Sequence, residues 1–144
     1  MVSWWPGDGS FDDVWDYNPA SATSGVTFST GVVGQAFKFT GTPGEFIDIN
    51  DNANLDAPHF TVDLWAEREG PGPNDGDGYG SIVIQKAVSS AGPSGSILSY
   101  SIWWDSDGKI RAVVGFLSDP NPFPGSAFLV SSDSFADNWP VHIA

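Results

Sequence analysis

Most of the side chains in this 144-residue chain that could do chemistry are carboxylates. Asp and Glu number 18 against five Lys and Arg, which gives a formal net charge of -13 at pH 7. Residues 74–80 alternate oxygen-bearing side chains with glycine, a pattern typical of loops that bind Ca²⁺. Asp75 and Asp77 are the candidate metal ligands. The EF-hand pattern is not met, because Tyr79 and Lys86 occupy two of its ligand positions, so a looser Ca²⁺ site and a metal-free loop both stay open.

A second acidic pattern, at residues 45–51, is similar to the catalytic strand of laminarinase-type glycosidases. Retaining hydrolysis needs two carboxyl groups about 5 Å apart on one face. Glu45 and Asp48 are three residues apart and therefore point to opposite faces of a strand, while Asn50 stands two residues beyond Asp48. A glycoside hydrolase is therefore the weakest hypothesis for this chain, and we do not expect an enzyme.

Other catalytic constellations are missing from the sequence. The chain has no cysteine, which excludes disulfides, thiolate metal sites and thiol nucleophiles. His59 and His142 are far apart, in no metal-binding spacing, and no Ser/His/Asp array accompanies them. We expect both histidines to be structural or solvated, not catalytic.

Aromatic side chains are the better candidates for binding. Trp4 and Trp5, and likewise Trp103 and Trp104, are adjacent in strand-like segments, where neighbours face opposite ways. Each pair can place one ring in the core and one outside, where it could stack on a sugar or seat a protein; the alternative is that both rings are covered. The predicted ligand-contacting residues are Trp15, Tyr17, Tyr79 and Trp104, of which the first two lie in a polar loop at residues 12–20.

Short strand-like runs, separated by clusters of Gly, Pro, Asn and Asp, must position these side chains. Their spacing favours a β-sandwich or barrel with antiparallel pairing, and no helical periodicity is visible. Residues 105–108 (Asp-Ser-Asp-Gly) predict a tight hairpin turn. The predicted strands span residues 2–5, 26–29, 34–40, 46–49, 60–67, 81–86, 97–104, 109–115, 127–131 and 139–144.

Composition narrows the class of partner. The few positive charges are scattered, so nucleic acid and anionic membranes are poor partners. No apolar run is long enough to span a membrane, which excludes insertion as a helix. Residues 1–10 do not have the pattern of a signal peptide, so an export signal would lie outside this chain. We predict one domain over residues 1–144.

Several segments, taken in order, resemble the laminin-G-like branch of the concanavalin-A-like lectin/glucanase superfamily. They are VSWWPGDG at 2–9, GVVGQAFKFTG at 31–41, FIDIND at 46–51, FTVDLWAE at 60–67, SIVIQK at 81–86, YSIWWDSDGKIRAVVG at 100–115 and NWPVHIA at 138–144. The resemblance implies an antiparallel two-sheet jelly roll. It also implies an extracellular or cell-surface module that binds carbohydrate or protein, sometimes with Ca²⁺.

The family pattern continues into further strands after the segment that resembles residues 139–144. We therefore expect a sandwich that is incomplete at its C-terminus, with unpaired strand edges that favour pairing with other chains. Two hypotheses follow. The first is a non-catalytic binding or adhesion module with carbohydrate as the favoured ligand. The second is a structural subunit that assembles into a homo-oligomer or fibre through its open edges, which another chain would complete.

Overall fold

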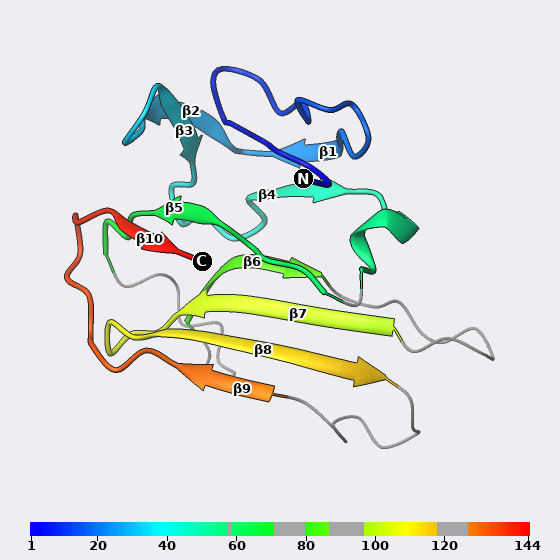
Figure 1. Ribbon diagram of the computed structural model, residues 1–144. Coiled ribbons are helices and arrows are strands. Elements are labelled where there is room, and N and C mark those ends of the chain that lie inside the picture. Colours follow the sequence, from blue (N-terminus) through cyan, green and yellow to red (C-terminus); the bar gives the residue numbers. More distant parts are fainter. Residues whose placement is uncertain (58, 71–79, 87–96, 118–126) are drawn as a thin grey trace. The chain divides into compact units, whose positions relative to one another are not determined.

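The computed structural model describes residues 1–57, 59–70, 80–86, 97–117 and 127–144 (Figure 1). Within these residues the protein is all-β, with ten strands, one short 3₁₀ turn at Ala53–Leu55 and antiparallel pairing throughout. The all-β, antiparallel prediction is therefore confirmed. The chain forms two compact units, Met1–Ala57 and Pro58–Ala144. A single domain over residues 1–144 stays a prediction.

Two short antiparallel ribbons make up the strands of the first unit. Strand β1 (Ala20–Ser24) pairs with β4 (Phe46–Ile49), and β2 (Thr27–Thr30) pairs with β3 (Gln35–Lys38). Gly25 separates β1 from β2 with a φ of 70°, a left-handed conformation that glycine adopts without strain.

Three phenylalanines form an aromatic cluster beside the β2–β3 ribbon. Phe28 and Phe37 are opposite each other in the ladder, with ring centroids 5.9 Å apart. Phe11, from the loop before β1, lies 4.8 Å from the ring of Phe28 and 5.6 Å from that of Phe37. These offset and tilted contacts are the arrangements that aromatic rings favour, and they anchor the N-terminal loop to the ribbon.

The first unit departs from the sequence-based prediction at two places. Residues 2–5 form no strand, because the backbone of Trp4 pairs instead with the loop at Asp13 and Val14. Strand β1 was missed because its sequence, ASATS, is small and polar and shows no apolar alternation. Its exposed residues are held by the ladder with β4, a long-range contact that no local pattern records.

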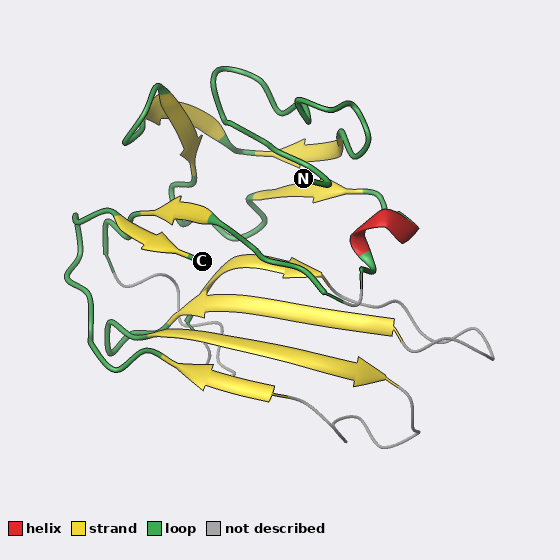
Figure 2. Cartoon of the chain, viewed as in Figure 1, coloured by secondary structure: helices red, strands yellow, loops and turns green. Residues whose placement is uncertain are grey.

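The second unit contains the larger sheet. Strands β6 (Ser81–Lys86), β7 (Ile97–Trp104), β8 (Ile110–Leu117) and β9 (Ala127–Val130) are hydrogen-bonded in that order (Figure 2). Strands β5 (Leu64–Ala66) and β10 (Val141–Ile143) form a separate antiparallel pair.

The predicted hairpin turn joins β7 to β8. The Asp105 N–H donates to the Lys109 carbonyl at 2.8 Å, and the Gly108 N–H donates to the Asp105 carbonyl at 3.0 Å. Gly108 has a φ of 82°, the conformation for which glycine was expected at this turn. The hairpin prediction is confirmed.

Both tryptophans at the end of β7 are buried. Trp104 is only 2% exposed; its indole N–H donates to the Gly108 carbonyl at 3.1 Å, and the Arg68 guanidinium lies 5.5 Å from the ring centroid. Phe135 meets the same ring edge-on at 6.2 Å. Trp103 is also buried, with the Phe128 ring 6.0 Å away. The prediction that Trp104 presents its ring to a ligand is therefore wrong, because the loop residues Arg68 and Phe135 cover the ring.

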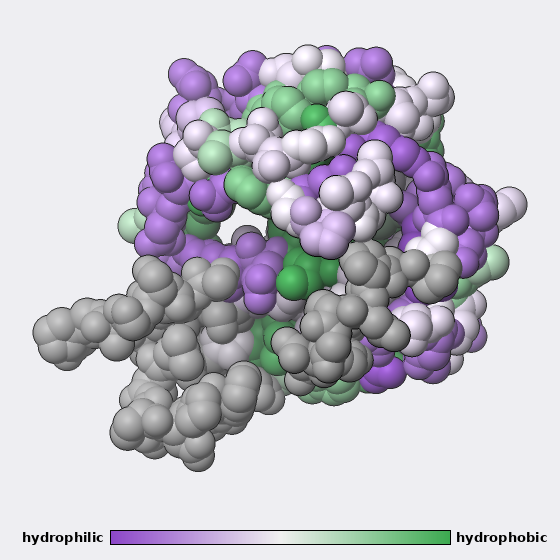
Figure 3. All heavy atoms as spheres, turned by 180° about the vertical axis from the view of Figure 1, so that it is seen from behind, coloured by the Kyte–Doolittle hydropathy of each residue, from purple (hydrophilic) through white to green (hydrophobic). Residues whose placement is uncertain are grey.

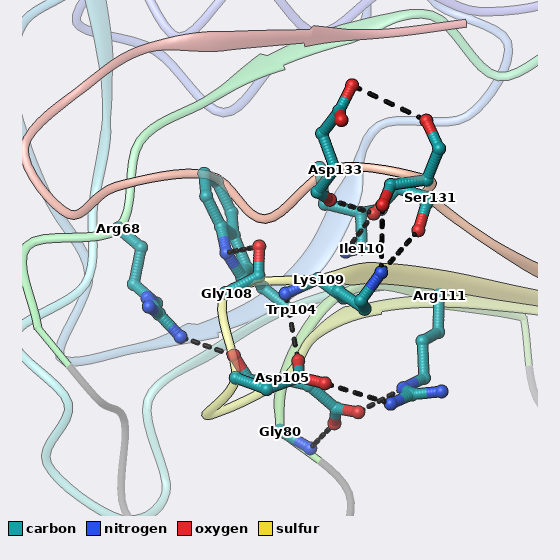
Figure 4. A network of polar contacts seen from close by, with 12 residues as sticks. Arg68, Gly80, Trp104, Asp105, Gly108, Lys109, Ile110, Arg111, Ser131 and Asp133 are labelled. Atoms are coloured by element: carbon teal, nitrogen blue, oxygen red, sulfur yellow. Dashed lines mark hydrogen bonds and ion pairs between the residues drawn. The ribbon is translucent and has the colours of Figure 1, made fainter.

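Asp105 is the centre of a polar network that joins the large sheet to the segments flanking β5 and β10 (Figure 4). Its carboxylate accepts hydrogen bonds from the Gly80 N–H at 2.9 Å and from the Arg111 guanidinium. Its carbonyl accepts from Arg68, which also forms a 2.6 Å ion pair with Asp137. Because removing one member would leave a buried charge unpaired, the network constrains all the segments it joins.

Gly80 provides a test of that constraint. A Cβ at Gly80 would lie 2.5 Å from the Asp105 Cα and closer still to the Trp104 carbonyl oxygen. We expect Gly80→Ala to lower the free energy of unfolding by about 3 kcal/mol, because backbone must move to admit the methyl group. Urea denaturation followed by tryptophan fluorescence measures the change.

The matched control is Gly70→Ala, since a Cβ there meets nothing within 4 Å. We expect that change to stay within about 0.5 kcal/mol of wild type. Equal effects at the two glycines would contradict the proposed close packing at Gly80.

Candidate functional site

A single buried carboxylate organises the loop at the start of the chain. The backbone N–H groups of Trp4 and Trp15 donate to Asp13 Oδ1 at 2.9 and 3.2 Å. Those of Tyr17 and Asn18 donate to Asp13 Oδ2 at 3.2 and 3.0 Å. Four main-chain donors, one of them nine residues away in sequence, therefore converge on Asp13.

The local sequence explains why the chain turns around Asp13. Aspartate side chains readily accept hydrogen bonds from backbone N–H groups a few residues further on, which favours a turn. The Asp16 N–H donates to the Asp13 carbonyl at 2.9 Å, and Asp16 has a φ of 56°. Aspartate tolerates this left-handed conformation better than most residues, so the loop reverses here with little strain.

Hydrogen bonds from further side chains also stabilise the loop. Trp5 donates its indole N–H to the Asn18 carbonyl at 2.8 Å, and the Asn18 side-chain amide donates to the Ser3 hydroxyl at 2.5 Å. Asn52, near the end of the unit, donates to the Tyr17 carbonyl at 3.4 Å. Asn18, like Asp13, is buried, so the loop carries its own polar core.

The same loop leaves three aromatic side chains open to solvent. Trp4 is 52% exposed, Trp15 50% and Tyr17 61%, although the backbone N–H of each is fixed on Asp13. We refer to Trp4, Trp15 and Tyr17 as the aromatic loop. A fixed backbone lowers the entropic cost of ligand binding, because fewer degrees of freedom remain to be ordered.

The predicted exposure of Trp15 and Tyr17 is confirmed, whereas Trp4 was not singled out as a ligand contact. The signal that could have found it is the Trp4–Trp5 pair. Trp5 is partly buried and hydrogen-bonded, and Trp4 faces outward, which is one of the two arrangements expected for adjacent tryptophans.

The electrostatics of the loop favour the charged form of Asp13. Burial acts to raise the pKa of this carboxyl, but the N–H groups of Trp4, Trp15 and Asn18, together with the Ser3 hydroxyl, outweigh it. The pKa of Asp13 is therefore held below its ordinary value. An ionised carboxylate is also the form that can accept all four backbone hydrogen bonds.

Glu45 has a structural role of the same kind. It accepts hydrogen bonds from the Thr40 hydroxyl and N–H, both at 2.6 Å, and from the Gly41 N–H at 3.0 Å. The Thr40 hydroxyl is the main cause of a lowered pKa at Glu45. Asp48 lies exposed on β4, so Glu45 and Asp48 are in separate environments.

The predicted calcium ligands Asp75 and Asp77, and the predicted contact Tyr79, lie outside the described residues. Among the residues that the structure does describe, no group of three or more His, Asp or Glu side chains is arranged to hold a metal ion.

His142 lies on β10 opposite Trp65 of β5, with the two rings 5.0 Å apart. Its Nε2 is 3.0 Å from Asp63 Oδ1. His59 is exposed.

Comparisons with known proteins leave the site to be judged on its geometry. No family model matches the sequence, and neither the curated proteins nor the solved structures include a significant match to it. No helix in the described part of the chain is long and apolar enough to cross a membrane.

Replacing the central carboxylate tests its role. We expect Asp13→Asn to lower the free energy of unfolding by about 2–4 kcal/mol, because an amide NH₂ cannot accept the backbone N–H groups that it would face. Asp12→Asn is the control, since Asp12 is exposed and its carboxylate accepts a hydrogen bond from the nearby Ser10 hydroxyl. Equal losses in the two variants would show that Asp13 is no special anchor.

The pH dependence of stability gives a second test. Unfolded Asp titrates near pH 3.9, above the folded pKa of Asp13, so in acid the unfolded chain binds more protons. The contribution of Asp13 is therefore complete above about pH 5 and declines as the pH falls through the folded pKa. We expect the stability gap between wild type and Asp13→Asn to be widest at pH 6 and to narrow below about pH 4. Urea denaturation from pH 6 to pH 3 measures the gap; a constant gap would contradict the assignment.

Proposed function

We propose that this protein is a non-catalytic binding module that takes carbohydrate through the aromatic loop. One observation carries the proposal: a buried carboxylate fixes the backbone of three residues whose aromatic side chains remain open to solvent. Exposed rings of this size are costly to hydrate and are typical of recognition surfaces. The buried polar core of the loop is built from Asp13 and Asn18, while each of the three aromatic residues is at least half exposed.

Carbohydrate fits this surface better than other ligand classes. A sugar presents an apolar C–H face that can cover an aromatic ring, and hydroxyls at its edge that can bond to nearby polar groups. The chain is strongly acidic, with a net charge of -13, and in the view of Figure 3 its hydrophobic residues form separate patches among hydrophilic ones. Polyanionic ligands would be repelled, so we favour neutral polysaccharides.

Several finer predictions belong to the same proposal. We infer an extracellular or cell-surface location and a laminin-G-like, two-sheet jelly roll from the resemblance of the sequence segments. Tyr79 would add a contact, and Asp75 and Asp77 would bind Ca²⁺. A protein ligand is the alternative for the same aromatic surface, because exposed Trp and Tyr are also frequent at protein interfaces.

A glycoside hydrolase remains the weaker alternative. The Glu45 carboxylate is engaged by Thr40 and Gly41, which supports a role in holding the turn before β4. Catalysis would need a second carboxylate on the same face about 5 Å away. The self-assembling subunit is supported by a different observation: within the described residues, strand β9 pairs with another strand on one side only.

Removal of single rings tests the proposal. We expect the wild-type protein to be retained by at least one of cellulose, chitin and starch, assayed with and without Ca²⁺. Trp15→Ala and Tyr17→Ala should each weaken that retention about 10- to 100-fold, because each removes the burial of one ring. Pull-down isotherms measure the change.

The control is Trp139→Ala, which removes another exposed tryptophan, from the second unit. Its isotherm should match that of wild type. Absence of retention on every polysaccharide, or an equal loss in the Trp139 variant, would refute the role of the aromatic loop.

A further inference from the structure

Strand β9 is an apolar outer strand. Its four residues, Ala127–Val130, are all apolar and all exposed, and Leu129 is 67% exposed. It pairs with β8 on one side, and in the described part of the chain no strand pairs with its other side (Figure 1). Open edges of this kind are templates for further strand pairing.

The register identifies the backbone groups on the open side. The Ser131 N–H donates to the Ile110 carbonyl at 2.9 Å, which places Ser131 in a hydrogen-bonded pair with β8. Such pairs alternate along an antiparallel ladder, so Leu129 also bonds to β8 at Ala112. Phe128 and Val130 therefore direct their N–H and C=O groups away from the sheet.

The side chains of β9 are apolar on both faces. Phe128 and Val130 share one face, where the Phe128 ring lies 6.0 Å from Trp103, and Leu129 occupies the opposite face. A strand that docks here therefore meets apolar side chains above and below the new hydrogen bonds.

The other edge of the same sheet is constructed differently. Strand β6 carries an irregular register between Ile82 and Ile84 and a lysine, Lys86, at its end. A bulge and a lysine are features by which proteins discourage pairing at an edge. Strand β9 has a regular register and no charge or proline, so of the two edges it is the one suited to association.

We propose that two copies of this chain pair through β9, antiparallel about a two-fold axis at Leu129. In this register, Phe128 of each copy exchanges two main-chain hydrogen bonds with Val130 of the other. Leu129 faces Leu129 on one side of the sheet, and Phe128 faces Val130 on the other. A large residue meets a smaller one in each pair, and the two four-stranded sheets become one continuous sheet.

Charge favours a second copy at this edge over other parts of the surface. Two chains of net charge -13 repel, so contact is least unfavourable where charge is absent. Strand β9 is uncharged, and the nearest acidic residue in the sequence is Asp133. Asp133 lies beyond the end of β9, outside the segment that would pair.

The short paired segment limits the strength of the contact. Four residues a side give a small interface, which is typical of reversible association and not of an obligate dimer. Because the axis passes through the same residue in both copies, the contact closes on itself and produces a dimer instead of a fibre. This inference does not rest on carbohydrate binding, which is assigned to the other unit.

Charged substitutions at Leu129, which lies on the proposed two-fold axis, test the dimer. We expect sedimentation of the wild-type protein to show a reversible monomer–dimer equilibrium. Leu129→Glu and Leu129→Lys should each weaken the dimer at least tenfold, because like charges meet across the axis. An equimolar mixture of the two variants should recover dimer, since opposite charges then face each other.

Two further variants separate pairing from misfolding. Val130→Pro removes an N–H that points away from β8, so it should weaken the dimer at least tenfold while the circular dichroism spectrum stays that of wild type. Ile82→Glu places the same charge on the exposed β6 edge and should leave the dimer unchanged.

Wild-type protein that stays monomeric up to millimolar concentration would overturn the proposal. So would fibres in electron micrographs, dissociation by Ile82→Glu, or a mixture of the two Leu129 variants that remains monomeric.

Discussion

In each unit a buried carboxylate that accepts hydrogen bonds from the backbone lies at the centre of a polar network. Asp13 gathers four such donors and thereby defines the loop that presents Trp4, Trp15 and Tyr17. In the second unit Asp105 bonds to the Gly80 N–H and to Arg111, and its carbonyl bonds to Arg68. In both cases a charge withdrawn from water is stabilised by several fixed dipoles or cations, so the surrounding backbone has little freedom to move.

This dependence on polar anchors agrees with the sparse apolar burial. Within the described residues the buried hydrophobic side chains are few, and three of the four, Ile102, Trp103 and Trp104, are consecutive on β7. Several large rings and the whole of β9 remain exposed. Exposed apolar surface of this kind is typical of sites that bind ligands or other proteins. The two proposals use different parts of it: the aromatic loop for sugars and β9 for a second copy.

Much of the strand pattern could be predicted from the sequence. The strands at residues 46–49, 81–86 and 97–104 have the predicted bounds, because regular alternation and flanking turn residues are local signals. Strand β1 was missed and residues 2–5 were wrongly assigned, since both depend on partners far along the chain. The laminin-G-like resemblance and the jelly roll stay predictions.

The candidate site, too, could be predicted from the sequence only in part. The exposure of Trp15 and Tyr17 followed from their place in a polar loop, but the special role of Asp13 among several nearby acids did not. Trp104 shows the limit most clearly: alternation predicted that it and Trp103 face opposite ways, yet Arg68 and Phe135 cover it. The sequence by itself determined an acidic, cysteine-free, antiparallel β protein, because composition and periodicity are local properties. Only the tertiary structure decided which carboxylate anchors a loop, which ring is covered and which edge stays open, because each depends on contacts between residues distant in the chain.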